Sequence, residues 1–276
     1  MRTVEAYGAK IPAIGFGTWP MKGRMCVEAV EAALESGYRH IDTAAGYQNE
    51  TEIGEAIRSA GINREKIFVT SKITPWDLGE GDMQRSATDS LSRLGLDHLD
   101  LILIHWPSRD LSVEQTIRSL NDVKRRGLAR HIGVSNFTTR LLEEAWRATE
   151  EPIVVLQCEY HPYLNQDKLL TTARSHKMAF TAYSPLGQGD VLRDPTVTGI
   201  AKRLGRAPAQ IVLRWLIQQK DVAAIPKSAH LARIRENIDV FDFDLETGDM
   251  ASISALARPD GRLVRDPDLA PEWDIQ

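Results

Sequence analysis

The sequence predicts an α/β protein with a (β/α)8 barrel (a TIM barrel), preceded by an N-terminal β-hairpin and carrying extra helices. Three short apolar segments each end at a polar residue, and these residues are Asp42, Lys72 and His105. Apolar runs separated by helical patterns are typical of parallel strands that are buried on both faces. In a (β/α)8 barrel the carboxyl ends of the strands share one rim, and this rim carries the chemistry.

With 276 residues, the chain suits one α/β barrel or two ordinary domains. Strand and helix patterns alternate along the chain, without a linker or a low-complexity segment between them. We therefore expect a single (β/α)8 domain over residues 1–276.

A hairpin is expected within residues 3–12, where Val4 and Ile11 stand on either side of a turn at Gly8. Eight strand patterns follow the hairpin. They cover 13–17, a segment ending at 42, 67–72, 99–104, 131–134, 152–156, 178–182 and 222–225.

Apolar residues at helical spacing fill the intervals between these strands. Several of the patterns stop at a glycine, which suits a helix C-terminus. Helices are expected at 27–34, 53–57, 83–94, 113–126, 141–148, 167–176, 196–204 and 208–219, in a short segment ending near 237 and at 246–257. The Pro and Gly residues within 183–189 predict a loop and not a helix. An irregular tail finishes the chain.

The composition points to small-molecule partners. The chain has 34 basic and 38 acidic residues, a net charge of −4, and neither sign forms a block that would bind nucleic acid or a membrane surface. Cys26 and Cys158 lie far apart and match no metal spacing, so we expect no metal site and no disulfide scaffold. The N-terminus lacks the apolar core of a signal peptide, and no apolar run is long enough to span a membrane. We expect a cytoplasmic protein.

Asp42, Tyr47, Lys72 and His105 supply the parts needed to protonate a carbonyl oxygen. A phenol can donate a proton to an oxygen that gains negative charge, but its reference pKa of about 10 makes it a weak acid at neutral pH. A lysine ammonium stabilises the phenolate, an aspartate orients that lysine, and a histidine can bind the same carbonyl. Each residue alone has an ordinary structural explanation. Their occurrence at three successive strand ends favours a catalytic set.

The sequence resembles the aldo-keto reductase superfamily over nearly its whole length. The motifs that carry the resemblance are Gly15-Phe16-Gly17-Thr18-Trp19, Tyr38-Arg39-His40-Ile41-Asp42-Thr43-Ala44, Tyr47, Lys72, His105-Trp106-Pro107, Gly133-Val134-Ser135-Asn136-Phe137 and Ile225-Pro226-Lys227-Ser228. The resemblance implies a (β/α)8 fold and NADPH-dependent reduction of a small-molecule carbonyl. It also implies that the four residues above are the catalytic tetrad, with Tyr47 as the proton donor.

A dinucleotide cofactor would need an unusual binding mode here, because the chain has neither a strand–GxGxxG–helix unit nor a Walker loop. Tyr183 offers a flat face for a nicotinamide ring, and the side chains of Ser135, Asn136 and Gln157 can form hydrogen bonds with its amide. By resemblance, these residues stack the ring and hold its carboxamide.

Lys227, Ser228 and Arg233 combine two cations and a hydroxyl near the start of a short helix, which suits a phosphate. By resemblance they bind the adenosine 2′-phosphate, and the loop from residue 184 to 189 covers the pyrophosphate. The expected cofactor contacts are Gly17, Thr18, Asp42, Ser135, Asn136, Gln157, Tyr183, Ser184, Pro185, Leu186, Gly187, Gln188, Gly189, Pro226, Lys227, Ser228, Arg233, Glu236 and Asn237.

The chain departs from the family pattern at Leu156, where we would expect Asn before Gln157. We expect one hydrogen bond to the carboxamide to be missing as a result. The affinity for the cofactor would then be below the family norm.

For the substrate we expect contacts from Trp19, Tyr47, His105 and Trp106. The two tryptophans can wall an apolar pocket, although packing at the rim explains Trp106 nearly as well. The loops after His105 and Tyr183 are short, so the rim should be open and suited to small polar carbonyls.

The C-terminal motifs 261–264 and 269–274 resemble the bacterial 2,5-diketo-D-gluconate reductase branch of the superfamily. Members of that branch reduce keto-sugar acids and small dicarbonyls such as methylglyoxal, and the resemblance implies similar substrates here. Arg262 and Arg265 could attract a substrate carboxylate, but a solvated tail is the simpler interpretation of both.

Two other hypotheses remain open. Lys72 could act as the Schiff-base nucleophile of a lyase, because lysines at barrel strand ends can do so. Alternatively, the protein could be a redox sensor that holds NADPH and turns over slowly. The phosphate-binding residues disfavour the lyase, and the complete tetrad favours turnover. We expect a monomer.

Overall fold

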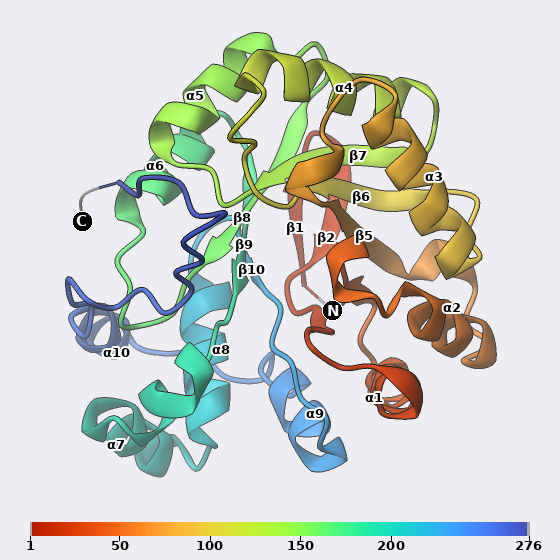
Figure 1. Cartoon of the computed structure of the whole chain (residues 1–276). Helices are drawn as coiled ribbons and strands as arrows, with labels where there is room; N and C mark the ends of the chain where they lie inside the picture. Colours follow the sequence, from red (N-terminus) through yellow and green to blue (C-terminus); the bar gives the residue numbers. More distant parts are fainter. Residues whose placement is uncertain (1, 275–276) are drawn as a thin grey trace.

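The computed structural model describes residues 2–274, so the ends of the expected domain, residues 1 and 275–276, lie outside the described residues. Eight parallel strands pair in chain order, and Figure 1 shows them at the centre with the helices around them. The strands are β3 (Phe16–Gly17), β4 (His40–Asp42), β5 (Phe68–Ile73), β6 (Leu99–Ile104), β7 (Ala129–Ser135), β8 (Ile153–Glu159), β9 (Ala179–Tyr183) and β10 (Val222–Ala224).

The first and last strands join, which closes the sheet into a barrel. The amide of Gly15 donates to the carbonyl of Ala224 at 2.9 Å, and the amide of Ala224 donates to Ala13 at 2.9 Å. Gly17 continues the pairing by donating to Pro226 at 3.0 Å. The expected (β/α)8 fold is confirmed, and the carboxyl ends of all its strands meet at one rim.

The expected N-terminal hairpin is also confirmed. It consists of β1 (Thr3–Ala6) and β2 (Ala9–Pro12), which pair antiparallel. Tyr7 and Gly8 form the turn with φ values of 48° and 85°. Two positive φ values in a two-residue turn match the twist of a hairpin.

Ten α-helices surround the strands within residues 2–274. They are α1 (Gly23–Glu35), α2 (Glu50–Ser59), α3 (Asp82–Leu94), α4 (Val113–Arg125), α5 (Thr139–Ala148), α6 (Asp167–Ser175), α7 (Pro195–Leu204), α8 (Pro208–Gln218), α9 (Leu231–Ile238) and α10 (Thr247–Ser254). The first turns of α1 and α2 precede the predicted starts, because those turns are partly exposed and lack apolar spacing. None of these helices has the length and apolarity that a membrane span requires.

Short 3-10 turns occupy several of the connections: η1 (Ala45–Tyr47), η2 (Arg64–Lys66), η3 (Pro75–Asp77) and η4 (Gly187–Arg193). The prediction of a loop over 183–189 was therefore wrong at its end, where η4 begins. Gln188 and Gly189 interrupt that turn with positive φ values of 53° and 101°. Short 3-10 pieces on either side of a kink have no apolar period, so the sequence pattern could not reveal them.

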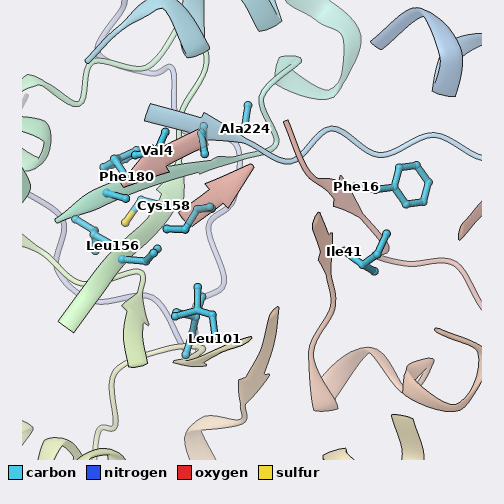
Figure 2. Packing of buried hydrophobic residues seen from close by; sticks show 14 of the residues in the cluster. Val4, Phe16, Ile41, Leu101, Leu156, Cys158, Phe180 and Ala224 are labelled. Atoms are coloured by element: carbon cyan, nitrogen blue, oxygen red, sulfur yellow. The ribbon is translucent and has the colours of Figure 1, made fainter. Parts of the chain in front are cut away.

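The strands are buried on both faces, as their apolar runs predict. Figure 2 shows buried side chains from several strands, among them Leu101, Leu156 and Phe180, which are at most 1% exposed. Leu156 stands between Val134 on β7 and Phe180 on β9 in the sheet register. This packing makes the barrel a rigid support for the polar residues at its rim.

Candidate active site

The four residues of the predicted tetrad meet at the barrel rim. Asp42 is the last residue of β4, Tyr47 ends the η1 turn that follows it, Lys72 lies in β5 and His105 directly follows β6. A cavity of about 1160 Å³ opens above them and is lined by Asp42, Tyr47 and His105. Lys72 does not line this cavity and is 1% exposed. It contacts Asp42 and Tyr47 without reaching the cavity itself.

The ammonium of Lys72 has three hydrogen-bond acceptors, which matches its three donors. Nζ lies 2.5 Å from Asp42 Oδ1, 2.8 Å from the carbonyl oxygen of Thr43 and 3.4 Å from the phenol oxygen of Tyr47. Burial lowers the pKa of Lys72, but the attraction of Asp42 and the contact with Tyr47 outweigh this effect and raise the pKa above its ordinary value. Lys72 is therefore a fixed positive charge beside Tyr47.

Tyr47 is held as a neutral phenol at neutral pH. Burial raises its pKa above the ordinary value, and the Lys72 ammonium opposes part of that increase. The Tyr47 ring centroid lies 5.0 Å from Lys72 Nζ and 5.5 Å from the His105 ring. A phenol in this setting can donate its proton, and the adjacent ammonium stabilises the phenolate that remains.

His105 is also neutral. Burial, with a smaller contribution from the Lys72 charge, holds the pKa of His105 well below its usual range. A neutral imidazole can donate one hydrogen bond to a carbonyl oxygen in the cavity. Its backbone carbonyl accepts a hydrogen bond from Asn136 Nδ2 at 2.9 Å. This contact fixes the position of His105 relative to β7.

The amide side chains predicted to bind the cofactor also tie the tetrad to the barrel. Gln157 Nε2 donates to Asp42 Oδ2 at 2.8 Å, so both carboxylate oxygens of Asp42 are occupied. The amide oxygen of Gln157 is not used in this contact and can accept from a carboxamide. Asn136 accepts from the Tyr183 hydroxyl at 2.7 Å and donates to Ser135 Oγ at 3.2 Å. Its amide is thus used in joining the ends of β6, β7 and β9.

Most of the predicted contact residues line the same cavity. Those that do are Gly17, Thr18, Trp19, Asp42, Tyr47, His105, Trp106, Asn136, Gln157, Tyr183, Ser184, Pro185, Leu186, Gln188, Gly189, Pro226, Lys227, Ser228, Arg233, Glu236 and Asn237. Ser135 and Gly187 do not line it, although both were predicted to contact the cofactor. Ser135 is fully buried behind Asn136.

The far end of the cavity fits the phosphates of a dinucleotide. Lys227 and Arg233 are exposed there, and within residues 2–274 neither forms an ion pair. Ser228 Oγ accepts from the amide of His230 at 3.0 Å, which holds the hydroxyl beside these cations. The volume exceeds the roughly 300–1,000 Å³ of a typical ligand pocket, so a dinucleotide and a small substrate both have room.

The expectation for Leu156 was wrong in its premise. Leu156 is fully buried in the hydrophobic core and does not line the cavity. Neighbouring residues of a strand point to opposite faces, so a side chain beside Gln157 faces away from Gln157. The structure therefore gives no reason for a lost carboxamide contact.

Sequence reasoning missed most of one wall of the cavity, which consists of Leu263, Val264, Arg265 and Asp266. The interpretation of Arg262 as part of a solvated tail was wrong. Arg262 is 9% exposed and its guanidinium lies 3.7 Å from the centre of the Trp273 ring. Apolar and aromatic residues in an otherwise irregular tail were the available signal that this segment packs on the barrel.

The two tryptophans predicted at the substrate end differ in burial. Trp19 is 62% exposed and Trp106 is 7% exposed, yet both line the cavity. Trp106 also packs against Trp273, with 6.3 Å between ring centroids. Trp106 therefore packs at the rim and also lines the cavity, and its contact with a substrate stays a prediction.

Comparison with known proteins agrees with this geometry. The family model described as "Aldo/keto reductase family" matches residues 13–258. An aldo-keto reductase of Mycobacterium avium (strain 104) is 44% identical over 261 residues, which cover 94% of this chain and 90% of that protein. The glyoxal reductase of Bacillus subtilis (strain 168) is 41% identical, with 95% and 94% covered, and the morphine 6-dehydrogenase of Pseudomonas putida is 41% identical, with 90% and 88% covered.

A crystal structure that carries the provisional name 2,5-diketo-D-gluconic acid reductase B is 46% identical to this chain. It superimposes with a TM-score of 0.97 over 99% of this chain and 98% of that one. The aldose reductase of Schistosoma japonicum is 34% identical, with a TM-score of 0.89 over 94% of each chain.

Proposed function

The chain belongs to the aldo/keto reductase family, and from this premise we propose that it is an NADPH-dependent reductase of small aldehydes, ketones and dicarbonyls. The observation that carries the proposal is the buried series Asp42, Lys72 and Tyr47, which ends in a neutral phenol facing the cavity beside a neutral His105. This arrangement can protonate a carbonyl oxygen at neutral pH.

A bound nicotinamide would supply the hydride that adds to the carbonyl carbon. Tyr47 transfers its hydroxyl proton to the carbonyl oxygen, and the product is an alcohol. Lys72 lies 3.4 Å from the phenol oxygen and compensates the negative charge left there. His105 donates a hydrogen bond to the same carbonyl oxygen and orients it. Asp42 keeps Lys72 charged and in place through the 2.5 Å contact.

The cofactor contacts are part of the proposal. Tyr183 supports the nicotinamide ring, and Gln157 accepts from its carboxamide through the amide oxygen that Asp42 does not use. Lys227 and Arg233 hold the 2′-phosphate, which is why we propose NADPH in preference to NADH. Two exposed cations without acidic partners among the described residues favour an anionic ligand at this end.

The substrate class rests on the cavity and on the relatives. Short polar dicarbonyls suit the space between Trp19, Trp106 and the tetrad. The relatives named for glyoxal and for 2,5-diketo-D-gluconic acid favour methylglyoxal and 2,5-diketogluconate. The relative named for morphine, at similar identity, is the reason to include a bulky substrate in any comparison.

Two observations weigh against a Schiff-base lyase. Lys72 does not line the cavity, and its pKa is raised, which keeps it protonated and not nucleophilic. Borohydride trapping with a keto substrate tests this directly. We expect no covalent adduct on Lys72, and a stoichiometric adduct would favour the lyase.

The proposal is tested by following NADPH absorbance with methylglyoxal and 2,5-diketogluconate. Tyr47→Phe removes the transferable proton without removing a proposed cofactor contact, so kcat should fall by about 10²-fold or more. The affinity for NADPH, measured by fluorescence titration, should stay near that of the wild type. Activity of this variant near wild type would contradict the role of Tyr47. Oxidation of bound NADPH for one turnover only would instead indicate a sensor.

A further inference from the structure

Residues 261–266, here called the rim segment, belong to the irregular C-terminal part of the chain, and four of them form a wall of the cavity. Leu263, Val264, Arg265 and Asp266 all line the cavity that also contains Tyr47 and His105. Figure 1 shows the end of the chain in dark blue, outside the barrel strands and without helix or strand of its own between α10 and residue 274. Something other than secondary structure must hold this segment in place.

Glu159, the last residue of β8, provides that support. Its side chain is fully buried, and its two carboxylate oxygens accept hydrogen bonds from two consecutive backbone amides of the rim segment. The amide of Leu263 donates to Oε1 at 2.8 Å, and the amide of Val264 donates to Oε2 at 3.0 Å. A buried carboxylate is costly unless it is paired in this way. Only a carboxylate offers two acceptor oxygens to these two amides.

Two further side chains complete the surroundings of Glu159. His161 Nε2 lies 3.0 Å from Oε1, and Arg262 Nη1 lies 3.7 Å from Oε2. Arg262 itself stacks on Trp273, which packs against Trp106 beside His105. This chain of contacts places the rim segment at the tetrad end of the cavity and not at the end near Arg233.

The start of the rim segment is fixed as well. A side chain at Gly261 would place its Cβ against the carbonyl oxygen of Tyr163, so the backbone approaches the loop after β8 more closely than any other residue allows. The amide of Arg258 donates to the same carbonyl at 3.1 Å. The chain is therefore held just before the residues that contact Glu159.

We propose that Glu159 is a positioning residue for substrate recognition, an inference that rests on the proposed function. Its carboxylate holds the rim segment as a wall of the substrate end of the cavity, at a fixed distance from the tetrad. On a strand, residues two apart share a face. Gln157 binds Asp42, and Glu159 binds the rim segment. One face of β8 therefore fixes the positions of both the catalytic carboxylate and the proposed substrate wall.

The test is the substitution Glu159→Gln. Glutamine keeps one acceptor oxygen, but it presents an NH₂ group to the second backbone amide, so at least one of the two contacts must be lost. We expect hydrogen–deuterium exchange in a peptide covering 261–266 to accelerate by about tenfold or more, since bonds to charged groups are the stronger ones. The KM for methylglyoxal should rise by a similar factor, while kcat and NADPH affinity stay within about threefold of wild type.

Asp100→Asn is the matched control. Asp100 is also a buried carboxylate that accepts a backbone amide, from Val69 at 2.9 Å, and pairs with an arginine, Arg64, at 2.7 Å. It lies near the start of β6, at the opposite end of the barrel from the rim. This variant should lose stability without faster exchange in the rim segment and without a change in KM.

Leu263→Ala tests the wall separately, because it removes a lining side chain and leaves the amide that Glu159 binds. It should raise KM without accelerating exchange, and an unchanged KM would contradict the wall. If Glu159→Gln does not fold, the wild-type amides of Leu263 and Val264 decide the matter. Slow exchange of these amides supports the proposal that Glu159 holds the rim segment, and rapid exchange contradicts it.

Unchanged exchange in a folded Glu159→Gln protein, or a fall in kcat at constant KM, would overturn the proposal. The exchange measurement needs no turnover. A wild-type protein without NADPH-dependent activity would therefore refute the proposed function. The hydrogen–deuterium exchange measurement would still test whether Glu159 holds the rim segment.

Discussion

At the scale of single residues, the site depends on which protonation state each buried group adopts. Burial favours the neutral forms of both Tyr47 and His105, which raises the pKa of the phenol and lowers that of the imidazole. Lys72 is equally buried, but the partner carboxylate of Asp42 reverses the effect and keeps it charged. One cation and two neutral donors thus stand together where a carbonyl oxygen would gain charge.

These directions predict the pH dependence of reduction. His105 binds its proton only below its ordinary range, and Tyr47 loses its proton only above about 10, the usual tyrosine value. The kcat/KM should therefore be level from neutral to mildly alkaline pH and fall once Tyr47 ionises. In Lys72→Met the alkaline fall should move to still higher pH, because Lys72 lowers the pKa of Tyr47, while the maximal rate drops. An alkaline fall well below pH 10 in the wild type would contradict the assignment.

Arg233 should discriminate between the two nicotinamide dinucleotides. Charge-assisted contacts contribute about 1.5–3 kcal/mol, so Arg233→Ala should weaken NADPH binding by roughly 10- to 100-fold and leave NADH nearly unchanged. Arg235→Ala is the control, since Arg235 is exposed on the same helix α9 and does not line the cavity. Equal losses for the two dinucleotides in fluorescence titration would place the phosphate elsewhere.

At the scale of elements, close packing of α2 on α3 depends on one missing side chain. A Cβ at Gly54 of α2 would approach within 2.2 Å of the carbonyl oxygen of Leu94 at the end of α3. The same carbonyl accepts from Arg58 Nη1 at 3.2 Å. The two helices can keep this contact only while residue 54 is glycine.

Two glycine substitutions should therefore have opposite effects on the free energy of unfolding. Gly54→Ala forces the helices apart and should destabilise the protein by about 1–3 kcal/mol, the usual cost of overpacking. Gly199 lies within α7, and beyond the backbone of its own helix and its chain neighbours a Cβ added there would meet no described atom within 4 Å, so Gly199→Ala should stabilise the protein by about 0.5–1 kcal/mol. Urea unfolding followed by circular dichroism measures both. A stabilising Gly54→Ala would show that α2 and α3 can separate freely.

At the scale of the whole molecule, the cavity is bounded by parts of the chain that are distant in sequence. The strand exits supply the tetrad, and the other walls come from residues 184–193, from the segment between Pro226 and Asn237 and from the rim segment. The connection between His105 and α4, which begins at Val113, is short. We expect such a short connection to leave the substrate end of the cavity open.

This shape predicts the substrate preference. The kcat/KM should be higher for methylglyoxal or 2,5-diketogluconate than for bulky aromatic or steroidal ketones, because an open substrate end would bury little of a large ligand. The measurement is a side-by-side comparison at fixed NADPH concentration. A clear preference for the bulky ketones would contradict an open substrate end.

Much of the fold and the tetrad could be predicted from the sequence, because both follow from local rules. A strand buried on both faces must be apolar throughout, so a polar residue such as Lys72 or His105 marks the place where it reaches the rim. Parallel strands bring those places together whatever the exact register. The alternation of strands and helices was therefore enough to unite Asp42, Tyr47 and His105 in one cavity.

Only the tertiary structure decided what each polar atom binds. Gln157 donates a hydrogen bond from its amide nitrogen to Asp42, whereas Leu156 beside it faces the core, because neighbouring residues of a strand point to opposite faces. Glu159 binds the amides of Leu263 and Val264 across 104 and 105 positions of the chain. No local period encodes contacts over such separations. They exist because the closed barrel brings the end of the chain back over β8, where a buried carboxylate requires donors.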